Sequence, residues 1–380
     1  MSLPFLLEIG TEEIPDWMIE PALADLKQRF ETLVKENGLG GEVAWVDATP
    51  RRLVLRAESL VARQPDRQEI VTGPPKSAGA GAVQGFAKKN GVAVEALQVT
   101  KTEKGEYYSF ERQTKGRATV EILWEALPGI ITGIYFPKTM YWTGKGGVRF
   151  IRPIRWIVAL LGENVVPFDV ADVESGRSTG GHRILGSQTS IEVTIANYEQ
   201  KLRDNCVLVH AAERRARIEA ALGADVQSDD ALLHTLVYLT EFPTPIRGAF
   251  DEAYLKLPKE ILSTVMRHHQ RYFSVVNEDA SLRPEFVAVT NTNGDPDGLI
   301  RRGNERVLRA RFNDARFFWQ VDQQRPLETR LADLEKVTFH AKLGNYREKT
   351  DRVVKFAEAL ASAAGKNIDR GALSRAALLS

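Results

Sequence analysis

The residues best suited to chemistry are arginines crowded between residues 301 and 319. On a helix of about 3.6 residues per turn, four of them gather on one face. These four are Arg302, Arg306, Arg309 and Arg316. A row of guanidinium groups can follow the phosphates of a nucleic acid, because each group donates several hydrogen bonds in a fixed geometry. The alternative is a solvated face whose arginines pair with Glu305 and Asp314. The sequence leaves both open, and the four arginines are predicted to bind RNA or a protein partner.

An apolar stripe at helical spacing lies beside this basic face and would hold the helix against a core. It consists of Leu308, Phe312, Ala315 and Trp319.

Two adjacent histidines, His268 and His269, invite a metal-site interpretation. Neighbouring side chains on a helix or a strand point in different directions, and no acidic residue stands at the spacing of a known metal motif. A structural pair near the C-terminal end of a helix is the better interpretation. No metal site is predicted.

Other motifs that suggest catalysis are incomplete. The stretch 143–147, around Lys145, has the glycines of a phosphate loop but not the order of one. Ser178 and His182 lie close in sequence without an identifiable orienting acid. The carboxylates Glu8, Glu12 and Glu13 fit helix capping better than general acid–base work. No catalytic residue is predicted.

The composition is that of an ordinary globular protein of 380 residues, with 43% hydrophobic and 27% charged residues. The formal net charge is +1, so contact with nucleic acid would depend on a local patch. Cys206 is the single cysteine, which excludes a disulfide within the chain and suits a reducing, cytoplasmic location. No signal peptide and no apolar run of membrane-spanning length is recognisable, so no membrane partner is expected.

Strand-like and helix-like segments alternate irregularly, which predicts an α+β fold class with several domains and mixed sheets. The Gly-, Ala- and Pro-rich stretch from Thr72 to Gly85 is interpreted as a loop or linker, so sub-boundaries are expected near 65–80 and near 143. A helix is expected from Val120 to Ile131, kinked or ended by Pro128. The chain stops inside an apparent helix, so we expect it to be the N-terminal part of a longer protein.

Several segments together resemble the β subunit of the two-subunit bacterial glycyl-tRNA synthetase. They occur in family order over nearly the whole chain: Leu6–Pro15, Pro50–Leu53, Pro137–Trp142, Arg149–Trp156, Gly181–Arg183, Asn291–Asn293, Gly303–Arg311, Asp314–Phe318 and Leu343–Arg352.

The resemblance implies both a partner and a domain plan. In this family the catalytic core, which uses ATP and Mg, lies in the α subunit, so no cofactor is expected in this chain. The β subunit would bind the α subunit and tRNA(Gly) and so support ATP-dependent attachment of glycine. Residues 1–325 would be an α+β region similar to the B3/B4 region of phenylalanyl-tRNA synthetase. Residues 326–380 would be the first helices of a truncated, all-α HD-like domain. The chain would then be part of a glycine–tRNA ligase, and inactive when isolated.

Two other classes remain open. One is a hydrolase, either an aminoacyl-tRNA editing domain or an HD phosphohydrolase, and the other is a subunit that acts only as a scaffold. A deep polar pocket would favour editing, a basic groove would favour RNA binding, and an exposed apolar patch alone would favour scaffolding.

Overall fold

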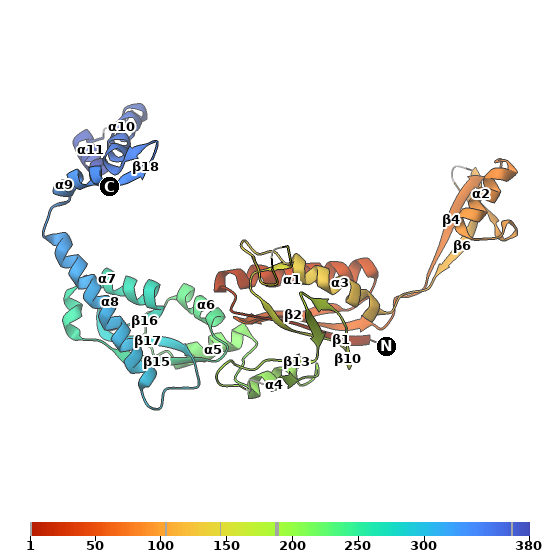
Figure 1. The fold of residues 1–380 in the computed structure, drawn as a ribbon, viewed down its shortest axis with the longest axis horizontal. Helices are drawn as coiled ribbons and strands as arrows, with labels where there is room; N and C mark the ends of the chain where they lie inside the picture. The colour runs from red at the N-terminus through yellow and green to blue at the C-terminus, as the bar shows by residue number, and fades with distance from the viewer. Residues whose placement is uncertain (1, 103–104, 145, 187–189, 366–367) are drawn as a thin grey trace. The chain divides into compact units, whose positions relative to one another are not determined.

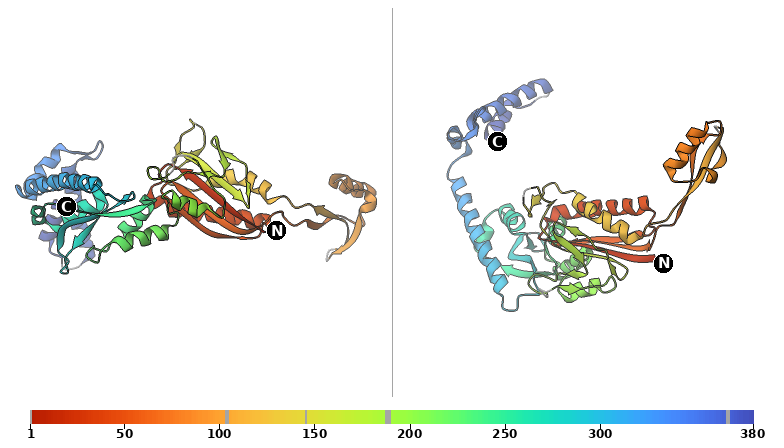
Figure 2. Two further views of the ribbon diagram at one scale, coloured as in Figure 1. Left: turned by 90° about the horizontal axis from the view of Figure 1, so that it is seen from below. Right: turned by 45° about the vertical axis from the view of Figure 1, so that its right-hand side comes forward.

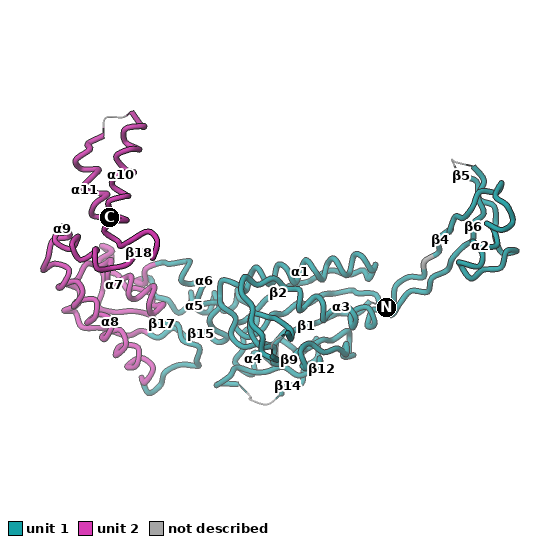
Figure 3. Tube along the Cα trace, turned by 45° about the horizontal axis from the view of Figure 1, so that its top comes forward, with its two compact units in different colours: residues 1–224, 228–246, 288–297 teal, residues 225–227, 247–287, 298–380 magenta. Residues whose placement is uncertain are grey.

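The computed structural model describes residues 2–102, 105–144, 146–186, 190–365 and 368–380. It has a mixed α+β architecture divided into two compact units (Figure 3). Unit 1 comprises Met1–Ala224, Ser228–Ile246 and Ala288–Asp297, and unit 2 comprises Asp225–Gln227, Arg247–Val287 and Gly298–Ser380. The α+β fold class is therefore confirmed. The predicted domain boundaries near 65–80, near 143 and at 325 stay predictions. The division into two compact units does not test whether any of these segments folds independently.

A seven-stranded sheet forms the centre of unit 1, in the order β11-β12-β9-β1-β3-β2 with β10 also paired to β9 (Figure 1). Its pairings are antiparallel except for β12 with β9. The strands are β1 (Ser2–Thr11), β2 (Glu42–Thr49), β3 (Arg52–Val61), β9 (Ile154–Leu161), β10 (Asn164–Val165), β11 (Asp169–Val170) and β12 (Val173–Gly176).

Strand β1 is buried on both faces, so its sequence Phe5-Leu6-Leu7 is a continuous apolar run. Phe5 stacks on Phe30 of helix α1 (Asp16–Asn37), while Leu6 packs in a cluster with Tyr198 of α4 (Tyr198–Asp204). Alternation along the strand therefore puts odd-numbered residues towards α1 and even-numbered residues towards α4. Glu8 is even-numbered and lies on the α4 side.

Three further helices complete unit 1 around the sheet: α3 (Thr119–Gly133), α5 (Ala211–Ala221) and α6 (Asp230–Leu239). Figure 2 shows α3 alongside α1. The helix was predicted to be kinked or ended by Pro128; α3 continues to Gly133, so Pro128 does not end it, and a kink there stays a prediction. Proline removes the hydrogen bond to the carbonyl of Trp124, and Trp124 is 53% exposed, so water can replace that bond. Two short sheets also belong here: β7 (Met140–Tyr141) with β8 (Arg149–Phe150), and β13 (Ser178–Thr179) with β14 (Ile191–Glu192).

Residues 63–118 leave the central sheet after β3 and return before α3; we call them the inserted module. Its three-stranded sheet has the order β4-β6-β5, with helix α2 on one face (Figure 1). The elements are β4 (Arg67–Pro75), α2 (Ala80–Asn90), the short helix η1 (Val94–Ala96), β5 (Gln98–Thr102) and β6 (Gly105–Thr114). The predicted loop from Thr72 to Gly85 is wrong at both ends, because Thr72–Pro75 belong to β4 and Ala80–Gly85 to α2. Pairing of β4 with β6 outweighs the local glycine and proline content of Thr72–Pro75.

A second sheet has the order β15-β17-β16. Its strands are β15 (Pro243–Ala249), β16 (Tyr272–Val276) and β17 (Leu282–Asn291), and the residues of β15 and β17 are divided between the two units. The other elements of unit 2 are η2 (Glu252–Lys256), α7 (Lys259–Thr264), the π-helix η3 (Val265–Gln270), α8 (Leu299–Gln323), α9 (Leu327–Arg330), η4 (Leu331–Lys336), β18 (Thr338–His340), β19 (Gly344–Asn345), α10 (Tyr346–Ala364) and α11 (Arg370–Leu379).

The segment 326–380 is mainly helical, but the two-stranded sheet β18–β19 is an element that the all-α prediction did not include. Its assignment to an HD-like domain, like that of 1–325 to a B3/B4-like region, stays a prediction. Among the described residues, no helix combines the length and apolar character needed to cross a membrane.

Candidate nucleic-acid and partner interface

Helix α8 carries all four arginines predicted from the sequence. It is rich in helix-favouring arginine, leucine and alanine and begins after Gly298, which adopts a left-handed conformation. Leu308 and Phe312, four residues apart, are fully buried, as predicted. Ala315 and Trp319 are only partly buried, whereas Phe312 packs against the rings of Phe250 and Tyr254.

The arginines share one exposed side of α8. At about 100° per residue, the four positions fall within an arc of about 80°. We call Arg302, Arg306, Arg309 and Arg316 the arginine arc.

Carboxylates do not neutralise the arginine arc within the part of the chain that the structure describes. Arg302, Arg306 and Arg309 form no ion pair with any described residue. Glu305, the predicted internal partner, instead accepts a hydrogen bond from the backbone N–H of Ala249, at 3.1 Å. The interpretation as a face of internal ion pairs is therefore not supported by the contacts.

Arg316 is held in place by neutral groups. It donates a hydrogen bond to Asn313 Oδ1 at 2.9 Å, and its guanidinium lies 5.3 Å from the ring centroid of Tyr254. The Tyr254 hydroxyl donates to the same amide oxygen at 2.7 Å. These contacts orient one end of the arginine arc without cancelling its charge.

The histidine pair lies in the π-helix η3, which continues α7 and ends at Arg271 with a positive φ of 57°. His268 and His269 are both exposed, and Arg267 Nη1 lies 3.2 Å from His268 Nε2. Nowhere among the described residues do three His, Cys, Asp or Glu side chains converge as a metal site would require. Of the predicted phosphate-loop-like stretch, Lys145 lies outside the described residues.

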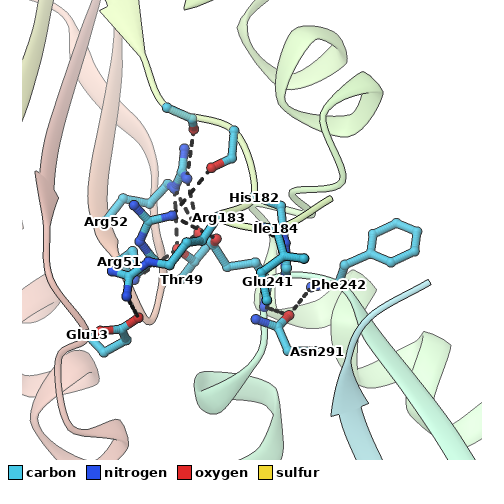
Figure 4. Close-up of polar contacts among 12 residues, drawn as sticks. Glu13, Thr49, Arg51, Arg52, His182, Arg183, Ile184, Glu241, Phe242 and Asn291 are labelled. Carbon is cyan, nitrogen blue, oxygen red and sulfur yellow. Dashed lines mark hydrogen bonds and ion pairs between the residues drawn. The ribbon is translucent and has the colours of Figure 1, made fainter. Parts of the chain in front are cut away.

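The structure contains a second site, a cluster of buried charges in unit 1 (Figure 4). The sequence analysis did not predict this cluster. We call Glu8, Arg52 and Glu241 the buried ion cluster; all three are essentially inaccessible to solvent. Arg52 Nη1 lies 3.1 Å from Glu8 Oε1, and Arg52 Nη2 lies 3.0 Å from Glu241 Oε1. Arg52 Nη2 also donates to the carbonyl oxygen of Gly180.

Neutral donors complete the cluster. Glu8 Oε1 accepts hydrogen bonds from Trp156 Nε1 and Thr179 Oγ1, each at 2.8 Å. The Trp156 indole lies directly over Gly10, where a Cβ atom would come within 1.9 Å of the ring, so only glycine fits there. Glu241 Oε1 accepts from Thr49 Oγ1 at 2.8 Å.

The backbone around Glu241 is fixed from another segment. Asn291 Oδ1 accepts hydrogen bonds from the N–H groups of Glu241 and Phe242, both at 2.9 Å (Figure 4). Asn291 comes from β17, so the buried ion cluster ties that strand to the central sheet within unit 1.

The electrostatic surroundings favour the charged forms of Arg52 and Glu241 at neutral pH. Burial acts to lower the pKa of Arg52, but Glu241 and Glu8 outweigh it and raise that pKa above its ordinary value. Burial likewise acts to raise the pKa of Glu241, but the Arg52 charge and the Thr49 hydrogen bond bring it below its ordinary value. Arg52 pairs with one oxygen of each carboxylate, so the cluster positions the segments that carry it, while Glu8 Oε2 and Glu241 Oε2 are buried without a hydrogen-bond partner among the described residues.

Glu12 and Glu13 lie at the exposed edge of this cluster rather than in a helix cap. The residue that caps α1 is Pro15, without a side-chain hydrogen bond, so the capping interpretation is wrong. Arg155 and Arg183 both bind Glu12, and Arg183 also lies 3.1 Å from Glu13 Oε1. Local sequence could not show this, because the partners are more than 140 residues away.

A pocket of about 480 Å³ borders the buried ion cluster. Trp156 and Thr179, which donate to Glu8, form part of its wall together with Arg155, Asp172, Glu174 and Ser178. The lining therefore mixes charged, hydroxyl and aromatic groups.

Comparisons with known proteins give a consistent result. A family model described as glycyl-tRNA synthetase beta subunit matches residues 5–380. A glycine–tRNA ligase beta subunit of Acidobacterium capsulatum is 44% identical over 98% of this chain and 56% of its own length. Those of Trichlorobacter lovleyi and Geobacter sulfurreducens are 40% and 39% identical, over 95% and 100% of this chain and 54% and 57% of their own lengths. The chain thus spans about half the length of the curated relatives it matches.

Proposed function

The chain belongs to the family of glycyl-tRNA synthetase β subunits, and from this we propose that it supports the ATP-dependent attachment of glycine to tRNA(Gly). It does so in the cytoplasm by binding tRNA and a catalytic α subunit. ATP and Mg act in the α subunit, so this chain contributes recognition and assembly.

The observation that supports tRNA binding is the unneutralised arginine arc on α8. Arg302, Arg306 and Arg309 form no ion pair among the described residues, so they are available to phosphates. Burial of Leu308 and Phe312 on the adjacent face holds the row in one orientation, which backbone recognition requires.

The test is the salt dependence of tRNA(Gly) binding by the chain with its α subunit. Arg306→Ala and Arg309→Ala should each lower the slope of log K against log salt by about one, equally for any tRNA sequence. Arg311→Ala is the matched control, because Arg311 is exposed on the same helix about 180° from the centre of the arginine arc. An unchanged slope with a lower Tm for Arg306→Ala would show an internal role. An unchanged slope with weaker α-subunit binding would assign the arc to the protein partner.

The isolated chain should form no glycyl-adenylate. The sequence carries no recognisable phosphate loop and no recognisable synthetase signature. Pyrophosphate exchange with glycine and ATP should stay at background, and a clear signal without the α subunit would refute the proposed division of labour.

One observation favours a second candidate, an aminoacyl-ester hydrolase. The pocket beside Trp156 and Thr179 is polar enough to hold an ester and a water molecule. Glycine is the smallest amino acid, so size already excludes most competitors from the synthetic site and leaves editing little to correct. Hydrolysis of alanyl-tRNA(Gly) by the chain, abolished by Thr179→Val, would favour this candidate.

A further inference from the structure

The inserted module carries an excess of positive charge. Residues 63–118 contain ten lysines and arginines against six aspartates and glutamates, a net charge of +4. The whole chain has a net charge of +1, so the rest of the chain is net negative. The module could therefore attract an anionic partner that the complete molecule would not.

The two faces of the module's sheet differ because side chains alternate along β6. Phe110 packs on Phe86 of α2, with ring centroids 5.9 Å apart, and Arg112 Nη2 donates to Asn90 Oδ1 of α2 at 2.7 Å. Even-numbered residues of β6 therefore face α2. Glu111 points to the opposite face.

Residues opposite one another in the ladder share a face. Glu69 is opposite Arg112 and Lys101 is opposite Glu106, so all four lie on the α2 side. Ile70 is opposite Glu111 and lies on the other face.

The two sheet acids on the α2 side, Glu69 and Glu106, are already paired. Lys76 Nζ lies 2.9 Å from Glu106 Oε2, and Arg112 Nη1 lies 3.3 Å from Glu69 Oε1. Three exposed lysines remain that form no ion pair with any residue the structure describes: Lys88, Lys89 and Lys101.

The opposite face is nearly neutral. Its described positions on β4 and β6 include Gln68, Ile70, Thr72, Ser109 and Gln113, with Glu111 as the charged residue. Of the charged strand residues named above, Glu111 is therefore the one that faces away from α2.

We propose that this lysine surface, formed by Lys88, Lys89 and Lys101, binds the phosphate backbone of tRNA as a second contact separate from the arginine arc. The inference rests on the proposed tRNA-binding function. RNA is favoured over a protein partner because lysine is depleted from protein interfaces, whereas phosphates recruit it as a point charge. The surface adds affinity for any tRNA sequence, since phosphates carry no sequence information.

The test measures binding of tRNA(Gly) by the chain with its α subunit at several salt concentrations. The triple variant Lys88→Ala, Lys89→Ala, Lys101→Ala should lower the salt slope by about three, and the triple lysine-to-arginine variant should restore it. Glu111→Gln on the opposite face and Lys27→Ala on α1 are matched controls and should bind like the unmodified protein.

Each outcome separates this inference from the proposed function. If the unmodified complex binds tRNA and Arg306→Ala lowers the slope but the triple lysine variant does not, the lysine surface is refuted and the proposed function stands. If the triple variant weakens binding to the α subunit with an unchanged tRNA slope, the surface binds protein and the inference is wrong. If the unmodified complex binds no tRNA, both are overturned.

Discussion

Arg52 is the residue on which the packing of unit 1 depends most directly. Its guanidinium lies between two buried carboxylates, and its removal would leave Glu8 and Glu241 without their main counter-charge. We expect Arg52→Met to lower the free energy of unfolding by about 3–5 kcal/mol, measured by urea denaturation.

The control is Arg117→Ala, which breaks an exposed pair with Glu125 and should change stability little. Combining Arg52→Met with Glu8→Gln and Glu241→Gln should recover part of the loss, because the uncompensated charges disappear. A single Arg52→Met variant as stable as Arg117→Ala would contradict the assigned role.

His210, at the N-terminal end of α5, makes the stability of unit 1 depend on pH. Its Nδ1 lies 3.2 Å from Asp47 Oδ2 and its Nε2 lies 3.2 Å from Glu199 Oε2. The hydrogen bond to Asp47 raises the pKa of His210; burial opposes this, and Glu199 adds to it. A raised native pKa means that the native state holds the proton more tightly than the unfolded state does.

This stabilisation is complete below the unfolded pKa of about 6.5 and is lost as the pH rises through the native pKa. We therefore expect Tm to fall as the pH is raised from about 6 to 8. His210→Gln should flatten the dependence of Tm on pH between about pH 6 and 8. If the Tm of this variant falls with pH as steeply as that of the unmodified protein, His210 is not the cause of the pH dependence.

At the scale of the element, α2 contains a glycine that packing does not require. A Cβ atom at Gly85 would meet no atom within 4 Å, and glycine inside a helix is unfavourable because of its backbone freedom. Gly85→Ala should stabilise the inserted module by roughly 0.5–1 kcal/mol, seen as slower amide exchange in α2.

Gly73 in the same module provides the contrast. A Cβ atom there would come within 2.6 Å of the Phe86 ring, so Gly73→Ala should destabilise the module. Similar effects of the two substitutions would show that the helix does not pack on the sheet as described.

At the scale of the whole molecule, the inserted module is attached through two antiparallel segments. Gln64 N–H donates to the Arg117 carbonyl at 2.9 Å, and Thr119 N–H donates to the Ala62 carbonyl at 3.0 Å. The core cluster around Leu6 contains no residue of the module. Replacing residues 65–116 by Asn-Gly, a sequence that favours a tight hairpin, should leave the Tm of the remainder almost unchanged.

The same deletion should lower the salt slope of tRNA binding as much as the triple lysine variant does. A deletion variant that fails to fold would show that the module and the central sheet are not independent. A folded variant with an unchanged slope would contradict the lysine surface.

The sequence by itself was enough to predict the family, the α+β fold class and the helix that carries the arginine arc. Helical period is a local property, so the placing of Leu308 and Phe312 on one face and Arg306 and Arg309 on another follows from spacing alone. The depth of burial does not follow from spacing: Leu308 and Phe312 are fully buried, whereas Trp319 on the same stripe is only partly buried.

Only the tertiary structure brought the buried ion cluster together. Arg52 meets Glu8 across 44 residues and Glu241 across 189, and no periodicity links positions so far apart. The same holds for Thr72 to Pro75, whose composition favours a loop but which pair with β6 as part of a strand. Where local sequence preference and long-range pairing disagree, the pairing determines the structure. The reason is that backbone groups and charges removed from water need a hydrogen-bond or ion-pair partner elsewhere in the chain.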